Sequence, residues 1–242
     1  MKQRIFKIKE NIALNKSIMK MVLTGDTKDI KCGQFVNLQI SGLYLRRPIS
    51  VCDCVGDELT LIYKIVGKGT EMMSEMQEGE LDVLTCLGNG YDTSCSGDAP
   101  LLVGGGVGVP PLYMLAKKLI EEGKKVSVIL GFNTKDEIFY EDEFKALGAD
   151  VKVTTVDGSY GVKGFVTDAL DMDYSYTYSC GPEPMLKALY KASKTSGQYS
   201  FEERMGCGFG ACMGCSCKTV TGYKRICKEG PVLKKEEILW EA

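Results

Sequence analysis

Short apolar runs separated by glycine and aspartate fill the first part of the chain. Several alternate between apolar and polar positions, which is typical of half-buried strands. Only one short helix is expected, over residues 71–76, with Thr70 as its cap. Many short strands with one helix predict a small antiparallel β-barrel. The expected strands cover residues 18–24, 34–40, 47–54, 58–66 and 81–87.

After residue 98 the pattern changes, and apolar strands alternate with amphipathic helices. This order predicts an α/β domain with a doubly wound parallel sheet. The expected strands are residues 101–103, 126–132, 151–156 and 174–180, and the expected helices are 110–122, 136–146, 164–170 and 182–196. From residue 201 neither pattern continues. We therefore expect domains at 1–98 and 99–200 and a cysteine-rich region at 201–242.

Composition narrows the possible functions. A net charge of −2 gives no basic excess for binding nucleic acid, and no apolar run approaches the ~18 residues that a membrane helix needs. The N-terminus shows no signal-peptide core, so we expect a cytoplasmic protein. There is no histidine, which excludes Ser-His-Asp catalysis, HExxH zinc sites and Rieske clusters.

Five of the eleven cysteines lie close together near the C-terminus. Cys207, Cys212 and Cys215 have the spacing C-x4-C-x2-C, and Cys227 follows later, which is the plant-type [2Fe–2S] pattern. Glycines between them allow tight turns that direct backbone N–H groups at sulfur. A four-cysteine zinc site is the alternative, although only Cys212 and Cys215 form a C-x2-C pair. Cys217 is expected to be a packed thiol that could replace a neighbouring ligand.

The expected barrel contains two segments suited to a flavin nucleotide. In Arg46-Arg47-Pro48-Ile49-Ser50, an arginine can bind a pyrophosphate and the serine can reach the flavin ring. Tyr63 offers a ring for stacking, and Gly67-Lys68-Gly69-Thr70 leads into a helix N-terminus that can bind an anion. Surface ion pairs and an ordinary turn would explain each segment separately. Their combination favours the cofactor site.

A glycine run follows the first strand of the α/β domain, where dinucleotide phosphates bind. It contains Gly104, Gly105, Gly106 and Gly108, but Val109 replaces the third glycine of GxGxxG. No acidic residue clearly ends the second strand, and the absence of an arginine there favours NAD, while Lys135 leaves NADP open. Cys180-Gly181-Pro182 ends the last expected strand, so the Cys180 thiol lies either beside the nicotinamide or in simple packing.

With these segments the chain resembles the ferredoxin reductase superfamily, and within it the electron transfer subunits of type B dihydroorotate dehydrogenases. The resemblance rests on RRPIS, GKGT, GGGVGVPPL, CGPEPML, ERMGCGFGACMGCSC and CKEGPV. It implies an FAD-binding barrel, an NAD-binding α/β domain and a C-terminal [2Fe–2S] region. By this resemblance FAD would contact Arg47, Pro48, Ile49, Ser50, Ile62, Tyr63, Lys64, Gly69 and Thr70. NAD would lie at Gly104, Gly105, Gly106, Gly108, Cys180, Gly181 and Pro182. The cluster would be held by Cys207, Cys212, Cys215 and Cys227.

The resemblance also implies a partner, an FMN-containing catalytic subunit that oxidises dihydroorotate to orotate in pyrimidine synthesis, with two copies of each subunit. Electrons would pass from FMN through the cluster and FAD to NAD, because only a flavin exchanges both single electrons and hydride. One alternative is the FAD/[2Fe–2S] subunit of an NADH-dependent ferredoxin:NADP oxidoreductase or sulfide dehydrogenase. Another, of a different class, is a zinc-binding regulatory module that senses nucleotides.

Overall fold

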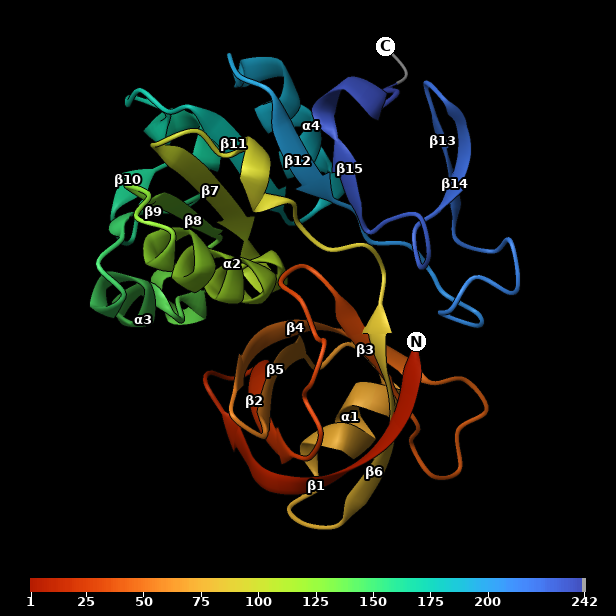
Figure 1. Cartoon of the computed structure of the whole chain (residues 1–242). Helices are drawn as coiled ribbons and strands as arrows, with labels where there is room; N and C mark the ends of the chain where they lie inside the picture. The colour runs from red at the N-terminus through yellow and green to blue at the C-terminus, as the bar shows by residue number, and fades with distance from the viewer. Residues whose placement is uncertain (241–242) are drawn as a thin grey trace.

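The computed structural model describes residues 1–240, which form a closed barrel and a separate seven-stranded sheet (Figure 1). The barrel comes first in the chain, and the cysteine-rich tail lies beside both bodies. The expected architecture, an antiparallel barrel followed by a parallel sheet and a C-terminal iron–sulfur region, is confirmed. Within residues 1–240 no helix has the length and apolar character needed to cross a membrane.

The barrel closes in the order β1-β2-β5-β4-β3-β6, with antiparallel neighbours throughout. Its interior is filled by apolar side chains such as Val36, Leu38 and Leu61. The first strand was not among the expected ones, although its apolar and basic residues alternate as strand residues do. The strands are β1 (Lys2–Ala13), β2 (Ile18–Thr24), β3 (Phe35–Leu38), β4 (Arg47–Val55), β5 (Glu58–Lys64) and β6 (Glu80–Leu87).

Helix α1 (Lys68–Ser74) begins three residues earlier than the expected helix over 71–76. Gly67 is its N-cap, and Thr70 occupies the third helical position instead of the cap. The Thr70 hydroxyl accepts hydrogen bonds from the backbone N–H groups of Val66 and Gly67, at 2.9 and 3.2 Å. The predicted cap is therefore wrong in position. Thr70 still fixes this turn, as the third residue of a capping box does.

The sheet has the order β10-β9-β8-β7-β11-β12-β15. All neighbours are parallel except β15, which pairs antiparallel with β12. Strand β15 comes from the tail, so the last segment of the chain completes the edge of this sheet. The strands are β7 (Pro100–Gly105), β8 (Ser127–Phe132), β9 (Asp150–Thr155), β10 (Val162–Lys163), β11 (Tyr176–Cys180), β12 (Gly197–Ser200) and β15 (Val232–Lys234).

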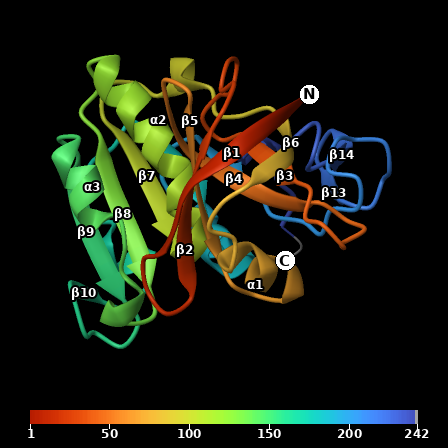
Figure 2. The same cartoon turned by 90° about the horizontal axis from the view of Figure 1, so that it is seen from below.

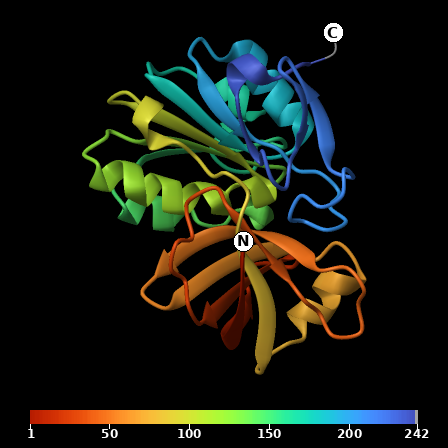
Figure 3. The ribbon, with the colours of Figure 1, turned by 45° about the vertical axis from the view of Figure 1, so that its right-hand side comes forward.

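Helix α2 (Pro110–Glu121) lies between the sheet and the barrel (Figures 2 and 3). Its Leu112 and Leu115 belong to one apolar cluster with Ile18 and Ile62 of the barrel. The expected helix over 136–146 is instead a 3₁₀ turn and helix α3 (Glu141–Ala146), because Tyr140 has a left-handed φ of 67°. Helix α4 is Glu183–Ala192, and the 3₁₀ turns are Thr93–Cys95, Gly106–Gly108, Lys135–Glu137, Val166–Ala169 and Lys235–Glu237.

The tail packs against the sheet and carries a hairpin of β13 (Ser216–Thr219) and β14 (Gly222–Arg225). Cys215, Cys227 and Ile226 are buried in an apolar cluster that also contains Phe35 of the barrel and Leu233 of β15. Figure 1 shows the cysteine loop that precedes the hairpin lying next to the barrel. The tail is thus held by both bodies.

Candidate electron-transfer site

A cleft of about 1110 Å³ lies where the barrel, the sheet and the tail meet. Arg47 and Pro48 line it from the start of β4, and Gly181 and Pro182 line it from the end of β11. The tail contributes Cys217 and residues on either side of the cysteine loop. The cavity is therefore lined by parts of the predicted flavin and nicotinamide segments and by the tail, while the four predicted cluster ligands and residues 104–108 are not in its lining.

On the barrel side, Arg47 lies directly over Gly69 at the N-terminus of α1. A Cβ atom at Gly69 would overlap the Arg47 guanidinium, so only glycine allows this approach. The Arg47 Nη1 donates to the carbonyl of Leu45 at 2.6 Å. Arg46 has a different arrangement, because its Nη1 bonds to Asp82 Oδ1 at 3.0 Å. That contact lowers the pKa of Asp82, assisted by a hydrogen bond from Gln3, and outweighs the opposing effect of burial. Arg47 therefore remains the arginine for an anion.

The remaining predicted flavin residues lie on β4, β5 and α1. Pro48, Ile49 and Ser50 are half-buried on β4, and Lys64 is exposed at the end of β5. Ile62 packs against helix α2. Tyr63 differs from the expectation of a stacking ring: its side chain is buried in the barrel and its hydroxyl donates to Asn11 Oδ1 at 3.1 Å.

On the sheet side, the two glycine-containing segments touch each other. Strands β7 and β11 are neighbours with Gly104 opposite Cys180. A Cβ at Gly108 would overlap the backbone of Cys180 and Gly181, and one at Gly105 would press on Met185. Gly106 has a φ of +53° with open space beside it. The glycines thus let the loop approach β11 closely and leave its backbone free for a ligand.

Cys180 is half-buried at the carboxyl end of β11. Burial raises the pKa of its thiol to about 12, and the Ser200 hydroxyl opposes this shift. The thiol is therefore neutral at physiological pH. A small neutral group at this edge leaves space in the crevice where ligands of such sheets bind.

Sequence reasoning missed an acidic residue at the end of β8. Glu137 lies five residues beyond Phe132, but its carboxylate folds back to Asn133, accepting from the backbone N–H at 3.1 Å and from Nδ2 at 2.9 Å. A carboxylate in this place can bind ribose hydroxyls and repel a 2′-phosphate. The 3₁₀ turn over Lys135–Glu137 brings it there, and a strand-end pattern could not reveal that turn.

The four predicted ligands lie in two pairs of thiols. The Cys212 and Cys207 sulfurs are 3.4 Å apart, and the Cys227 N–H donates to the Cys215 sulfur at 3.5 Å. Within residues 1–240, no three of the cysteine or acidic side chains converge closely enough to form a ready-made metal site. Two pairs of thiols nevertheless suit a [2Fe–2S] cluster, in which each of the two irons takes two cysteines. Cys217 lies outside these pairs, on β13.

Backbone amides of the loop point at the sulfurs. Burial raises the pKa of Cys207, but N–H groups of Cys212, Phe209 and Ala211 outweigh it and lower that pKa to about 6. Arg225, also missed by sequence reasoning, donates to the carbonyl of Gly210 at 2.6 Å and forms an ion pair with Glu229. The loop is thus organised to stabilise negative sulfur.

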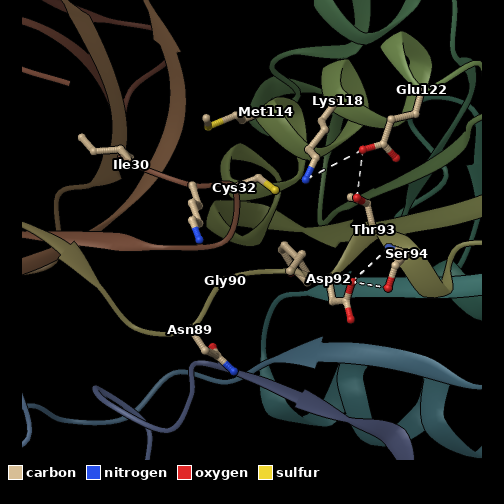
Figure 4. Close-up of a pocket in the computed structure, with 12 residues that line it drawn as sticks. Ile30, Cys32, Asn89, Gly90, Asp92, Thr93, Ser94, Met114, Lys118 and Glu122 are labelled. Carbon is tan, nitrogen blue, oxygen red and sulfur yellow. Dashed lines mark hydrogen bonds and ion pairs between the residues drawn. The ribbon is translucent and has the colours of Figure 1, made fainter. Parts of the chain in front are cut away.

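A second hollow, of about 780 Å³, lies at the linker between the two bodies (Figure 4). The linker contributes Tyr91 and Asp92, the barrel contributes Cys32, and helix α2 and its C-cap contribute Lys118 and Glu122. Glu122 pairs with Lys118 and accepts from Thr93, so its charge is already neutralised. The linings of the two hollows have no residue in common.

Comparison with known families assigns chemistry to these parts. Residues 202–239 match the iron–sulfur cluster binding domain of dihydroorotate dehydrogenase B, and residues 102–191 match an oxidoreductase NAD-binding domain. The barrel and sheet form the FAD/NAD-binding fold of ferredoxin reductases. The chain is therefore part of an oxidoreductase with FAD, NAD and iron–sulfur cofactors.

Two curated relatives are similar over nearly the whole chain. Both are electron transfer subunits of dihydroorotate dehydrogenase B (NAD⁺). The one from Bacillus pumilus is 45% identical and covers 98% of each chain, and the one from Fusobacterium nucleatum is 46% identical and covers 96% of each. A solved structure of an NADH-dependent reduced ferredoxin–NADP oxidoreductase matches with a TM-score of 0.88 and 30% identity, over 97% of this chain and 90% of that one. This chain belongs to the family of dihydroorotate dehydrogenase B electron transfer subunits.

Proposed function

We propose that this chain carries electrons from the FMN of a dihydroorotate-oxidising catalytic subunit through a [2Fe–2S] cluster and FAD to NAD⁺. The observation that carries the proposal is the cleft lined jointly by Arg47 and Pro48 of the barrel, by Gly181 and Pro182 after β11, and by the tail on both sides of the cysteine loop. An iron–sulfur cluster exchanges single electrons and NAD⁺ accepts hydride, and a flavin supplies the conversion between them.

For FAD, we assign the pyrophosphate to Arg47 together with the helix start at Gly69 and Thr70. An arginine and unpaired N–H groups at one point are a strong anion site. The half-buried edge of β4 from Pro48 to Ser50 would then face the ring system, with the β5 residues supporting it. The full proposed set is Arg47, Pro48, Ile49, Ser50, Ile62, Tyr63, Lys64, Gly69 and Thr70, with Tyr63 acting from inside the barrel.

For NAD, the glycine loop after β7 would hold the phosphates, and the end of β11 would lie along the nicotinamide. The support is the close packing of these two segments and the open backbone at Gly106. Glu137 adds support for NAD over NADP. The proposed set is Gly104, Gly105, Gly106, Gly108, Cys180, Gly181 and Pro182.

For the cluster, the proposed ligands are Cys207 with Cys212 and Cys215 with Cys227. Their N–H donors and the Arg225 contact would stabilise the negative cluster, which tends to raise its reduction potential. Cys217 would be a packed thiol beside the cleft. A structural zinc site is disfavoured by the family match of residues 202–239.

The relatives are named as electron transfer subunits of dihydroorotate dehydrogenase B, which implies a catalytic subunit as partner. We propose two copies of each subunit in the complex and a cytoplasmic location. We also propose functional units at residues 1–98 for FAD, 99–200 for NAD and 201–242 for the cluster. The boundary at 98 falls just before β7, and β15 joins the third unit to the sheet of the second.

A second candidate is the FAD/[2Fe–2S] subunit of an NADH-dependent ferredoxin:NADP oxidoreductase. The solved structure with a TM-score of 0.88 favours it at the level of fold. The 45% identity of the Bacillus pumilus relative, against 30% for that structure, favours dihydroorotate dehydrogenase B.

Anaerobic purification of the native complex tests the choice. We expect an FMN subunit to co-purify, with FAD, iron and acid-labile sulfide present, and dihydroorotate to reduce NAD⁺. A large partner resembling glutamate synthase, with NADP-linked activity and none with dihydroorotate, would contradict the proposal. Zinc without sulfide would reject the cluster.

A further inference from the structure

Asn37 lies on the outer face of the barrel, between the flavin segment and the cysteine loop. Its neighbours Val36 and Leu38 fill the barrel interior, so the alternation of β3 turns Asn37 outward. Strand β4 pairs with β3 so that Asn37 is opposite Pro48, and Phe35 is opposite Ser50. Asn37 therefore shares a face with two of the proposed flavin residues.

The Asn37 side chain bonds to the cysteine loop, 170 residues away in sequence. Its Nδ2 donates to the backbone carbonyl of Cys207 at 3.3 Å. Gly208, with a φ of +74°, lies against the same amide, and a Cβ there would overlap Nδ2. This side-chain hydrogen bond joins the barrel directly to the cysteine loop, and it ends on a proposed cluster ligand.

Burying the Asn37 side chain costs free energy unless its polar atoms are hydrogen-bonded. It is 2% exposed, and its Oδ1 has no hydrogen-bond partner among residues 1–240. A leucine of similar shape would avoid a buried acceptor without a donor. A cluster presents sulfur acceptors, whereas a flavin has hydroxyl and ring N–H donors. The unpaired Oδ1 of Asn37 is therefore a place where a donor group can bind.

We propose that Asn37 is a positioning residue for electron transfer between the flavin and the cluster. Its carboxamide holds the Cys207 backbone against the barrel face that carries Pro48 and Ser50. The inference rests on the proposed cofactor residues and names a residue that none of the sequence motifs contains.

The test is Asn37→Leu in the intact, anaerobically purified complex, with Asn89→Leu as the matched control. Asn89 also anchors the tail, since its Nδ2 donates to the Val232 carbonyl at 2.7 Å, but it belongs to the linker. NADH is added, and flavin absorbance and the EPR signal of the cluster are followed separately. We expect Asn37→Leu to slow cluster reduction by about tenfold, the lower end of what outer-shell partners of metal ligands contribute. The fast phase of flavin reduction, which reports FAD, and the FAD and iron contents should stay at the wild-type level, while the later FMN phase slows with the cluster.

Amide hydrogen exchange gives an independent readout. Asn37→Leu should raise exchange at residues 206–214, and Asn89→Leu should raise it around Val232 instead. Equal slowing of cluster reduction in both variants, or unchanged exchange in the cysteine loop of Asn37→Leu, would overturn the inference. Wild-type protein whose cluster NADH cannot reduce would refute the proposed electron path, and the exchange result would then decide the role of Asn37 alone.

Discussion

Cys212 pairs with Cys207 in the tail, and its replacement by serine tests the ligand set. Because the flavin residues lie on other elements, we expect Cys212→Ser to lose the cluster while keeping FAD. Iron, sulfide and flavin analysis of anaerobic protein measures both. The control Cys217→Ser leaves the four proposed ligands intact and should keep the cluster. A cluster that survives in Cys212→Ser but disappears when Cys217→Ser is added would make Cys217 a substitute ligand.

The Arg47 guanidinium lies over the start of α1 and bonds to backbone carbonyls but to no carboxylate within residues 1–240, so Arg47→Ala should weaken FAD binding. Loss of a charged hydrogen bond, about 1.5–3 kcal/mol, corresponds to roughly a ten- to hundredfold rise in the dissociation constant. Fluorescence titration of deflavinated protein measures it. Arg46→Ala is the comparison: its guanidinium is engaged by Asp82, so the effect on FAD should be much smaller. The reverse order would move the pyrophosphate site to Arg46.

Individual side chains differ in how far the sequence reveals them. The cysteine spacing and the RRPIS segment can be recognised in the sequence, because the residues that form each pattern are close together in the chain. Asn37 and Arg225 act through contacts with Cys207 and Gly210 that only the folded chain creates. Glu137 depends on a turn that reverses its direction. Local patterns hold no information about such contacts, so these residues could not be predicted.

At the scale of elements, one ion pair ties strand β4 of the barrel to helix α2 of the NAD-binding domain. Lys117 of α2 bonds to both oxygens of Asp53 on β4, at 2.9 and 2.7 Å. Lys117→Met would leave the buried Asp53 unpaired, so we expect a loss of about 3 kcal/mol in the free energy of unfolding. Denaturant titration measures this, and stopped-flow mixing with NADH should show slower flavin reduction.

Lys118→Met is the control for this pair, because Lys118 and Glu122 form an exposed ion pair worth ~0.5 kcal/mol. Adding Asp53→Asn to Lys117→Met should restore part of the stability, since the unpaired charge is then gone. Equal effects of the two lysine variants would mean that the interdomain pair does not position α2.

Elements with strong periodicity were predicted well, and those that depend on tertiary context were not. Strands β2 and β8 and helix α2 follow their apolar patterns closely. Strand β1 was missed because exposed basic residues cover its outer face. Strand β15 has only three residues and exists because β12 offers it an edge. The left-handed Tyr140 splits the expected helix before α3, and nothing in its sequence signals that conformation.

At the scale of the molecule, the tail packs against both the barrel and the seven-stranded sheet. It also exposes several apolar side chains. Its hairpin and cysteine loop expose Phe209, Met213, Val220 and Tyr223, which we call the tail face. Tyr223 is the most exposed of the four, at 72%, and Met213 and Val220 follow at 61% each. Exposed apolar side chains beside a redox centre suit a partner that must exchange electrons with it.

We therefore expect Tyr223→Asp combined with Met213→Asp to weaken assembly with the catalytic subunit. Placing charges in a buried apolar contact should cost at least about 2 kcal/mol, or roughly thirtyfold in the dissociation constant. Analytical ultracentrifugation measures assembly, and FAD and iron contents show whether the subunit itself is intact. Phe165→Asp is the control, because Phe165 is 64% exposed but precedes the 3₁₀ turn Val166–Ala169, on the sheet and not on the tail. If Phe165→Asp disrupts assembly and the tail-face variant does not, the partner binds the NAD-binding domain, and its electrons must then reach the cluster from another side.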